Sequence, residues 1–177
     1  MKKLLLLLAT VSLLIAGGFT LESGDLGGQL SMKEVYNGFG CRGENVSPAL
    51  AWKDAPKGTK SFAVTVYDPD APTGSGWWHW VVFNLPATVT SLSAGAGDPA
   101  KGLMPKGAVQ SATSYGKGGF GGACPPVGDK AHRYVFTVYA LDVESLPLDA
   151  AATPALVGYM LNAHAIAKAS LISSYGR

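Results

Sequence analysis

Three segments of the chain are apolar almost without interruption and predict the central strands of a β-sheet. They are rich in β-branched and aromatic residues, which favour strands, and proline-containing turns follow two of them. Because polar residues do not alternate with the apolar ones, both faces of each strand are expected to be covered. The segments are 61–67 (SFAVTVY), 77–85 (WWHWVVFNL) and 133–141 (RYVFTVYAL).

Shorter apolar segments separated by turn-rich stretches complete the pattern of an all-β sandwich. Weaker strands are expected near residues 30–36, 49–52 and 110–114. Residues 116–130 (GKGGFGGACPPVGDK) contain six Gly and two Pro and therefore predict a loop. Loops of this length inside a compact domain are usually functional.

The last part of the chain has a different pattern, which predicts a helix. Thr153 is typical of an N-cap, and Pro154 suits the first helical position. The helix is expected to run for about 20 residues and to end near Gly176. The fold class is therefore β-rich α+β, a β-sandwich with a C-terminal helix packed on it. Apolar residues recur at helical spacing at Leu156, Tyr159, Met160, Ala163, Ala167 and Leu171.

The N-terminal residues predict a secretory signal peptide over 1–18. Lys2 and Lys3 precede a long apolar run, and small residues follow it. Cleavage is expected after Gly18, with Thr20 as the alternative position. An uncleaved membrane anchor is the competing interpretation, although the run is short for a membrane span, which takes about 20 residues.

Export would leave residues 19–177 as a single domain in the periplasm or outside the cell. Because the apolar run does not end in Cys, a lipoprotein is not expected.

Of all residues, 47% are apolar and only 15% are charged, which argues against disorder. Without Lys2 and Lys3, 12 basic residues balance 12 acidic ones. A neutral domain has no clustered charge for nucleic-acid binding.

Cys41 and Cys124 are the chain's two cysteines, 83 positions apart. An even number in an exported protein favours a disulfide, and two separate buried thiols are the alternative. Closing such a loop would stabilise the fold by about 4 kcal/mol in the chain-entropy model. Two cysteines are too few for an all-Cys zinc site.

Two acidic residues stand directly after the first predicted strand, in the turn Asp68-Pro69-Asp70-Ala71-Pro72. Two prolines restrict the backbone, so the turn is a rigid mount for both carboxylates. In the alternative interpretation, the acids only cap local backbone N–H groups.

A third polar residue, His79, lies inside the second predicted strand, where alternation places it on the face opposite Trp78 and Trp80. His79 is either a core histidine whose hydrogen bonds are made within the protein or part of a functional site.

His132, Arg133 and Tyr134 stand at the start of the third predicted strand, and alternation places His132 and Tyr134 on one face. Arg133, on the other face, could form a surface salt bridge. The acids, the histidines and the tyrosine could converge on one small pocket, to which residues 121–123 offer backbone N–H groups for an anion. The acids would orient the histidines or share a proton with phosphate. Anion binding is expected to tighten at mildly acidic pH, where the histidines are protonated.

Two other classes of site use the same residues. An enzyme of the hydrolase type could employ the Asp and His side chains in acid–base chemistry, although the sequence has no GxSxG motif. A metal ion could be ligated by Asp68, Asp70, His79 and His132, but their spacing matches no local metal motif. Binding without catalysis is favoured, and neither a metal nor another cofactor is expected.

Long motifs of the chain resemble the phosphatidylethanolamine-binding protein family, also called the Raf kinase inhibitor-like family, in its bacterial branch. They are NVSPALAW, GTKSFAVTVYDPDAP, WWHWVVFNLP, CPPVGD and HRYVFTVYALD, and the resemblance covers roughly residues 30–176. It implies a Greek-key β-sandwich with C-terminal helical structure, and a pocket for phosphate-like groups such as a phospholipid headgroup. It also implies regulation of other proteins, including kinase or protease inhibition, and a homodimer.

Matching the family's pocket position by position assigns binding roles in this sequence. The resemblance implies that the pocket is formed by Asp68, Asp70, Pro72, His79, Gly122, Pro125, His132 and Tyr134, with Arg133 beside them. This sequence departs from the pattern of the eukaryotic family members at one place: it has Cys124-Pro125-Pro126 where they have a Gly-containing segment. A Cys124 tied to Cys41 would alter the rim of the pocket and stiffen its loop.

Overall fold

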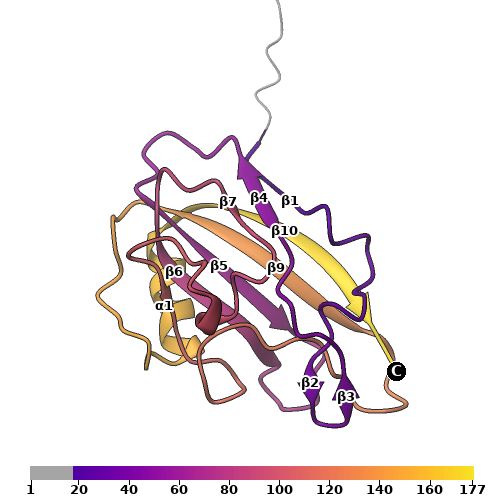
Figure 1. Cartoon of the computed structure of the whole chain (residues 1–177). Coiled ribbons are helices and arrows are strands. Elements are labelled where there is room, and N and C mark those ends of the chain that lie inside the picture. Colours follow the sequence, from indigo (N-terminus) through magenta and orange to yellow (C-terminus); the bar gives the residue numbers. More distant parts are fainter. Residues whose placement is uncertain (1–17) are drawn as a thin grey trace, which may run out of the picture.

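The computed structural model describes residues 18–177, and the predicted signal peptide, apart from Gly18, lies outside them. The chain forms ten strands, one short 3-10 helix and one α-helix within this range (Figure 1). In order they are β1 (Thr20–Glu22), β2 (Asn37–Gly38), β3 (Cys41–Arg42), β4 (Leu50–Lys53), β5 (Ser61–Asp68), β6 (Trp77–Pro86), β7 (Ser91–Leu92), η1 (Pro99–Lys101), β8 (Val109–Gln110), β9 (His132–Leu141), α1 (Pro154–His164) and β10 (Ala165–Tyr175).

The three strongly apolar segments are β5, β6 and β9, and they form the middle of a five-stranded antiparallel sheet with the order β10-β9-β5-β6-β8. Within this sheet β5, β6 and β8 are adjacent in chain order, with β7 of the smaller sheet between β6 and β8 in the sequence, and β9 returns to lie beside β5. This arrangement is a Greek key. A smaller antiparallel sheet, β1-β4-β7, packs over one face, so the predicted sandwich is confirmed.

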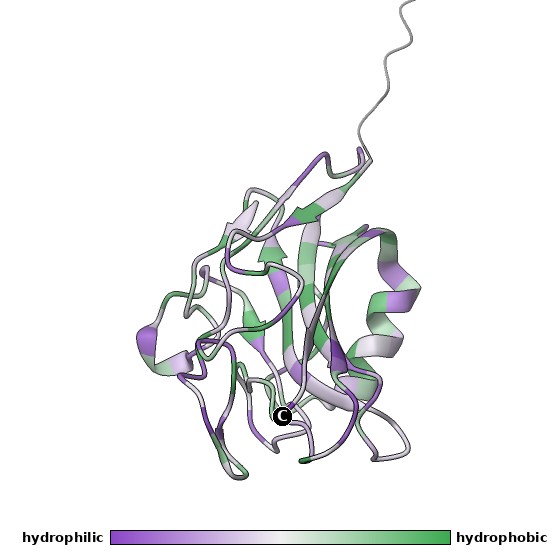
Figure 2. Cartoon of the chain, turned by 90° about the vertical axis from the view of Figure 1, so that its right-hand side faces the viewer, coloured by the Kyte–Doolittle hydropathy of each residue, from purple (hydrophilic) through white to green (hydrophobic). Residues whose placement is uncertain are grey.

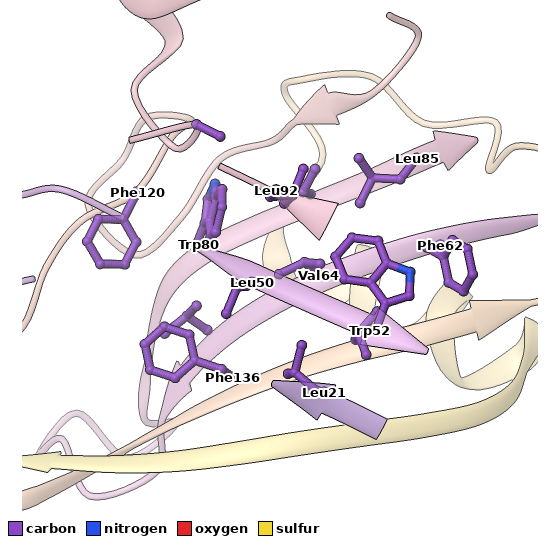
Figure 3. Packing of buried hydrophobic residues seen from close by; sticks show 14 of the residues in the cluster. Leu21, Leu50, Trp52, Phe62, Val64, Trp80, Leu85, Leu92, Phe120 and Phe136 are labelled. Carbon is purple, nitrogen blue, oxygen red and sulfur yellow. The ribbon is translucent and has the colours of Figure 1, made fainter. Parts of the chain in front are cut away.

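Apolar side chains from both sheets form the main core. Trp52 of β4 and Phe62 of β5 meet with ring centroids 5.4 Å apart, and Leu21, Leu50 and Leu92 of the small sheet face the large one (Figure 3). A second core lies on the other face of the large sheet, where α1 buries side chains against β5, β6 and β9. Figure 2 shows the helix on one side of the strands. Both faces of the central strands are covered, as predicted.

The C-terminal segment corrects one expectation. The helix begins as predicted, with Thr153 Oγ1 accepting from the N–H of Leu156, but it ends at His164 and the chain continues as β10. Ala167 and Leu171 therefore lie on a strand and face the main core, and Gly176 ends no helix. β10 pairs with β9 along almost its whole length, and the backbone N–H and C=O groups that point toward β9 are engaged in the sheet. That tertiary pairing outweighs the helix propensity of an alanine-rich segment.

The weaker strand predictions have mixed outcomes. The segment 49–52 is confirmed as β4, and 116–130 contains no strand or helix within the described structure. The segment 30–36 contains a turn and one isolated bridge, between Val35 and Ala123. Strand β8 covers only the first position of the predicted segment 110–114.

Candidate functional site

A cavity of about 210 Å³ opens where β5 ends and where β6 and β9 begin. In an antiparallel sheet the end of one strand lies beside the starts of its neighbours, so Asp68, His79 and His132 are brought together although they are far apart in sequence. The loops after β5 and before β9 and the β2–β3 hairpin complete the walls. The lining residues are Phe39, Asp68, Ala71, Pro72, Thr73, Trp77, His79, Tyr115, Cys124, Pro125, Pro126, His132 and Tyr134.

Asp68 is buried at the floor of this cavity and has two roles. Its Oδ1 accepts hydrogen bonds from the N–H groups of Asp70 (2.8 Å) and Ala71 (3.1 Å), which holds the proline-rich turn. Its Oδ2 lies 2.7 Å from Nδ1 of His132. Asp68 therefore makes the local backbone contacts of the turn interpretation and also lines the cavity, where its role in binding stays a prediction.

His132 is buried between two carboxylates. In addition to Asp68 on Nδ1, Oδ2 of Asp129 lies 3.3 Å from Nε2. Each ring nitrogen therefore lies beside a carboxylate oxygen, so both nitrogens of His132 are engaged within the protein. His132 and Tyr134 share a face and Arg133 is exposed, as alternation predicts.

His79 occupies an extra position in β6. Val66 of β5 pairs with Trp80 while Tyr67 pairs with Trp78, so His79 forms a β-bulge. As a result the two tryptophans lie on opposite faces, Trp80 in the main core and Trp78 against the second one, and the prediction that they share a face is wrong. The bulge directs the imidazole into the cavity wall.

The protonation state of His79 follows from its surroundings. Its Nδ1 lies 2.7 Å from the carbonyl oxygen of Gly121, so Nδ1 carries the hydrogen and donates. Burial lowers the pKa of His79 to about 4, so the ring is neutral near pH 7 and Nε2 is an acceptor. Nε2 has no hydrogen-bond partner among residues 18–177.

Tyr134 presents a second buried polar atom of this kind. Its ring stands edge-on to His79, with centroids 5.0 Å apart, and its Oη likewise finds no hydrogen-bond partner in the described part of the chain. Burial raises the pKa of Tyr134, so the hydroxyl keeps its hydrogen and can donate. Nε2 of His79 and Oη of Tyr134 are called the open pair below. Buried polar atoms are normally hydrogen-bonded, so the open pair indicates a place for a ligand.

Asp70 points away from the cavity. Its carboxylate accepts from Nη2 (2.7 Å), Nε (2.9 Å) and the backbone N–H (2.9 Å) of Arg133. These hydrogen bonds lower the pKa of Asp70 to about 2. Asp70 and Arg133 thus form the surface salt bridge that was the alternative interpretation for the arginine, and Asp70 does not line the cavity.

Gly122 also lies behind the cavity wall. Its N–H donates to Oδ1 of Asn45 (2.7 Å), and the N–H groups of Gly121 and Ala123 donate to His79 O (2.8 Å) and Glu34 O (3.1 Å). The three groups expected to bind an anion are therefore engaged within the protein. A Cβ at position 122 would lie 2.1 Å from the carbonyl oxygen of Glu34, so close packing requires the glycine.

Sequence reasoning missed the aromatic wall of the cavity. Tyr115 donates from Oη to the carbonyl of Gly122 (2.7 Å), and burial raises its pKa. Its ring meets Trp77 edge-on, with centroids 5.4 Å apart, and Phe39 in a stacked arrangement at 5.8 Å. Phe39 and Tyr115 stand beside glycines in turn-rich segments, and their local pattern carries no signal that they meet.

The predicted disulfide is present. Cys41 of β3 is joined to Cys124, which lines the cavity. The bridge fastens the β2–β3 hairpin to the loop that carries Pro125 and Pro126. The thiol of Cys124 is therefore not a nucleophile in the oxidised protein.

A family model described as phosphatidylethanolamine-binding protein matches residues 22–176, almost all of the described chain. The chain belongs to the phosphatidylethanolamine-binding protein family. The family resemblance implied by the motifs is thus confirmed, and membership supports a ligand-binding or regulatory role in general.

Relatives in this family include bacterial proteins. UPF0098 protein YbcL of Escherichia coli (strain K12) is 56% identical over 162 residues, which cover 90% of this chain and 88% of the relative. The crystal structure of YbcL, described as a new member of the mammalian PEBP family, matches with a TM-score of 0.89 and 55% identity over 91% of this chain and 99% of that one. A putative PEBP homolog from Chlamydia trachomatis matches with a TM-score of 0.75 and 32% identity, over 90% of this chain and 98% of that one.

A third relative in the phosphatidylethanolamine-binding protein family, from Mycobacterium tuberculosis, is named putative lipoprotein LppC. It is 36% identical over 77% of this chain and 63% of its own length. That name hints at envelope association for the relative.

Two further structural findings concern residues 18–177. Their single α-helix, α1, is too short to cross a membrane. No group of three or more His, Cys, Asp or Glu side chains within this range is placed to hold a metal ion.

Proposed function

We propose that this protein is an exported binding protein whose cavity takes phosphate-like groups, such as a phosphate monoester or a phospholipid headgroup. The observation that carries the proposal is the open pair, two buried polar atoms without hydrogen-bond partners in the described chain, which belong to two residues that line the same cavity. A phosphate with one remaining proton fits both of them, because Tyr134 can donate to a charged oxygen and neutral His79 can accept from the P–OH group.

The other polar side chains at this end of the sheet already have partners within the protein, which leaves the open pair for a ligand. Asp68 accepts from two backbone N–H groups and lies 2.7 Å from Nδ1 of His132. His132 also lies beside Asp129 through Nε2. In this proposal His132 and Asp68 position the floor of the cavity, and the open pair contacts the ligand.

Binding is favoured over the hydrolase alternative by the state of the hydroxyl and thiol groups in the cavity wall. Cys124 is joined to Cys41, and the hydroxyl of Thr73 donates to the carbonyl of Gly76 (2.6 Å). The hydroxyl of Tyr115 donates to Gly122. Neither Cys124 nor Thr73 has a hydrogen bond to a histidine or carboxylate among the described residues. The hydroxyl of Tyr115 lies 3.5 Å from Nδ1 of His79, but that nitrogen carries a hydrogen donated to Gly121 and so cannot accept the proton of the hydroxyl.

The proposal is tested by calorimetric titration with inorganic phosphate and with phenyl phosphate. In Tyr134→Phe the ring stays and only the unbonded hydroxyl is lost, so the fold is expected to be unchanged. Both ligands should bind about tenfold to a hundredfold more weakly, because a hydrogen bond to a charged group is removed. Tyr159→Phe, on the exposed face of α1, is the matched control. Equal affinities in wild type and Tyr134→Phe would overturn the proposal.

Two parts of the biological role remain predictions. Export to the periplasm or the medium depends on the predicted signal peptide, which cell fractionation tests directly. The homodimer and the inhibition of kinases or proteases are implied by the resemblance alone, and sedimentation of the purified protein tests the first of these.

A further inference from the structure

Phe39 occupies a backbone conformation that a phenylalanine rarely adopts. Gly38 pairs with Cys41, so Phe39 and Gly40 are the two loop residues of the β2–β3 hairpin. Their φ angles are 51° and 81°, the pattern of a type I′ turn. The first position of that turn favours Asn, Asp or Gly, and a bulky side chain there is strained. Residues with strained backbones cluster at functional sites, so the strain at Phe39 points to a functional role for its ring.

The ring of Phe39 lines the mouth of the cavity. It stacks on Tyr115, with a centroid distance of 5.8 Å and an interplanar angle of 12°, and it also meets Tyr36 at 5.5 Å. Phe39 is nevertheless 68% exposed. Tyr115, the ring beneath it, has its hydroxyl 3.5 Å from Nδ1 of His79 at the floor. The cavity therefore has a polar floor at the open pair and an apolar, partly uncovered aromatic wall above it.

Contacts on two sides hold the hairpin in this position. The Cys41–Cys124 disulfide joins it to the cavity loop. Arg177 links the same two segments, donating from Nε to the carbonyl of Pro125 (2.6 Å) and from Nη2 to the carbonyl of Phe39 (3.4 Å). A hairpin with strands of two residues is not stable by itself, so these links position the ring.

We propose that Phe39 is a ligand-contacting residue that selects phosphate monoesters carrying an apolar group over bare phosphate, and that the Cys41–Cys124 disulfide holds it in place to do so. This inference rests on the proposed function. The phosphate would occupy the open pair, and the esterified group would cover the exposed ring of Phe39 between Trp77 and Pro125. Burial of that ring against the ligand would remove apolar surface from water.

The test compares phenyl phosphate with inorganic phosphate by calorimetric titration of wild type and Phe39→Asn. Asparagine suits the first position of a type I′ turn, so the hairpin is expected to form at least as well while the ring is lost. Phenyl phosphate should bind about tenfold more weakly, and inorganic phosphate should change by less than twofold. Val127→Ala is the matched control, because Val127 is 78% exposed in the same loop as Pro125 and lies outside the cavity wall.

The outcomes separate the two proposals. If wild type binds neither ligand, the proposed phosphate site is wrong and this inference falls with it. If wild type binds both and Phe39→Asn weakens both equally, or neither, the phosphate site stands and the role of Phe39 is wrong.

A second variant, Cys41→Ser with Cys124→Ser, keeps the ring and unties the hairpin. In this variant the ratio of the affinity for phenyl phosphate to the affinity for inorganic phosphate should fall about fivefold or more relative to the wild type. An unchanged preference in a folded double variant would overturn the role of the disulfide.

Discussion

Nδ1 of His79 lies 2.7 Å from the carbonyl oxygen of Gly121, and this contact determines which hydrogen-bonding role is left to Nε2 in the proposed binding of phosphate. The hydrogen bond keeps the proton on Nδ1, so Nε2 can only accept while the ring is neutral. Because burial lowers the pKa of His79 to about 4, protonation of the free protein does not supply a donor at Nε2 near neutral pH. The proton between Nε2 and a phosphate must come from the ligand or from solvent during binding.

The first prediction is that phosphate affinity increases as pH falls. A phosphate monoester loses its second proton near pH 6. Above that pH the ligand is a dianion and His79 is neutral, so each complex must take up one proton. Affinity for phenyl phosphate should therefore drop about tenfold per pH unit between pH 7 and 8 and level off below pH 6. Calorimetric titration from pH 5 to 8, in two buffers of different ionisation enthalpy, measures the affinity and the proton uptake together.

The control for this prediction is His79→Gln. Its amide can donate to a dianion without taking up a proton, so binding should be weaker than in wild type and nearly independent of pH. Circular dichroism shows whether the variant keeps the fold. An affinity of the wild type that does not change from pH 5 to 8 would contradict this account of the open pair.

The second prediction concerns the stability provided by the Cys41–Cys124 disulfide. The bridge closes a loop with a sequence separation of 83 residues, so the chain-entropy model gives about 4 kcal/mol of stabilisation. Reduction of the wild type, or the double Cys→Ser variant, should lower the free energy of unfolding measured in urea by about that amount. The double variant should show no further change with reductant. A wild type whose unfolding midpoint is the same with and without reductant would argue against the bridge in solution.

The central sheet and half of the site are readable from the sequence because they depend on local pattern. Continuous apolar segments predict β5, β6 and β9, and antiparallel pairing then brings Asp68, His79 and His132 to one end of the sheet. The Gly- and Pro-rich segment 116–130 is a loop in the structure, as its composition predicts. Six of the residues assigned to the pocket by resemblance line the cavity, namely Asp68, Pro72, His79, Pro125, His132 and Tyr134.

The remaining features depend on interactions between distant segments. The alanine-rich spacing after His164 suits both a helix and a strand, and only pairing with β9 decides for β10. The bulge at His79 appears in the pairing of β6 with β5 and has no sequence marker. Whether Asp70 faces the cavity or Arg133 depends on the direction in which the turn leaves β5. Phe39 reaches the cavity because its hairpin is fastened to a loop more than 80 residues away.

The third prediction tests which face of α1 is buried. Leu161 is buried against the second core, whereas Leu156, one and a half turns earlier on the same helix, is 45% exposed. Leu161→Ala should reduce the free energy of unfolding by about 2–5 kcal/mol because it leaves a cavity. Leu156→Ala, the matched control, should change it by less than about 0.5 kcal/mol. Urea unfolding measures both, and similar losses in the two variants would show that the helix packs through a different face.

The fourth prediction is that the exported protein begins at Phe19. The ring of Phe19 stacks on Phe62, with centroids 6.1 Å apart, and Thr20 pairs with Lys53 at the start of β1. Cleavage after Gly18 keeps both contacts, whereas cleavage after Thr20 removes them and shortens β1. The intact mass of protein recovered from the periplasm or the medium identifies the first residue.

Ala16→Glu supplies the control for this measurement, because signal peptidase sites require a small residue at the −3 position. The variant should accumulate as the uncleaved precursor. A mature wild-type protein that retains residues 1–18 would contradict the signal peptide and favour the membrane anchor. One that begins at Leu21 would contradict the predicted start at Phe19, because that chain lacks both the Phe19–Phe62 contact and the Thr20–Lys53 pair.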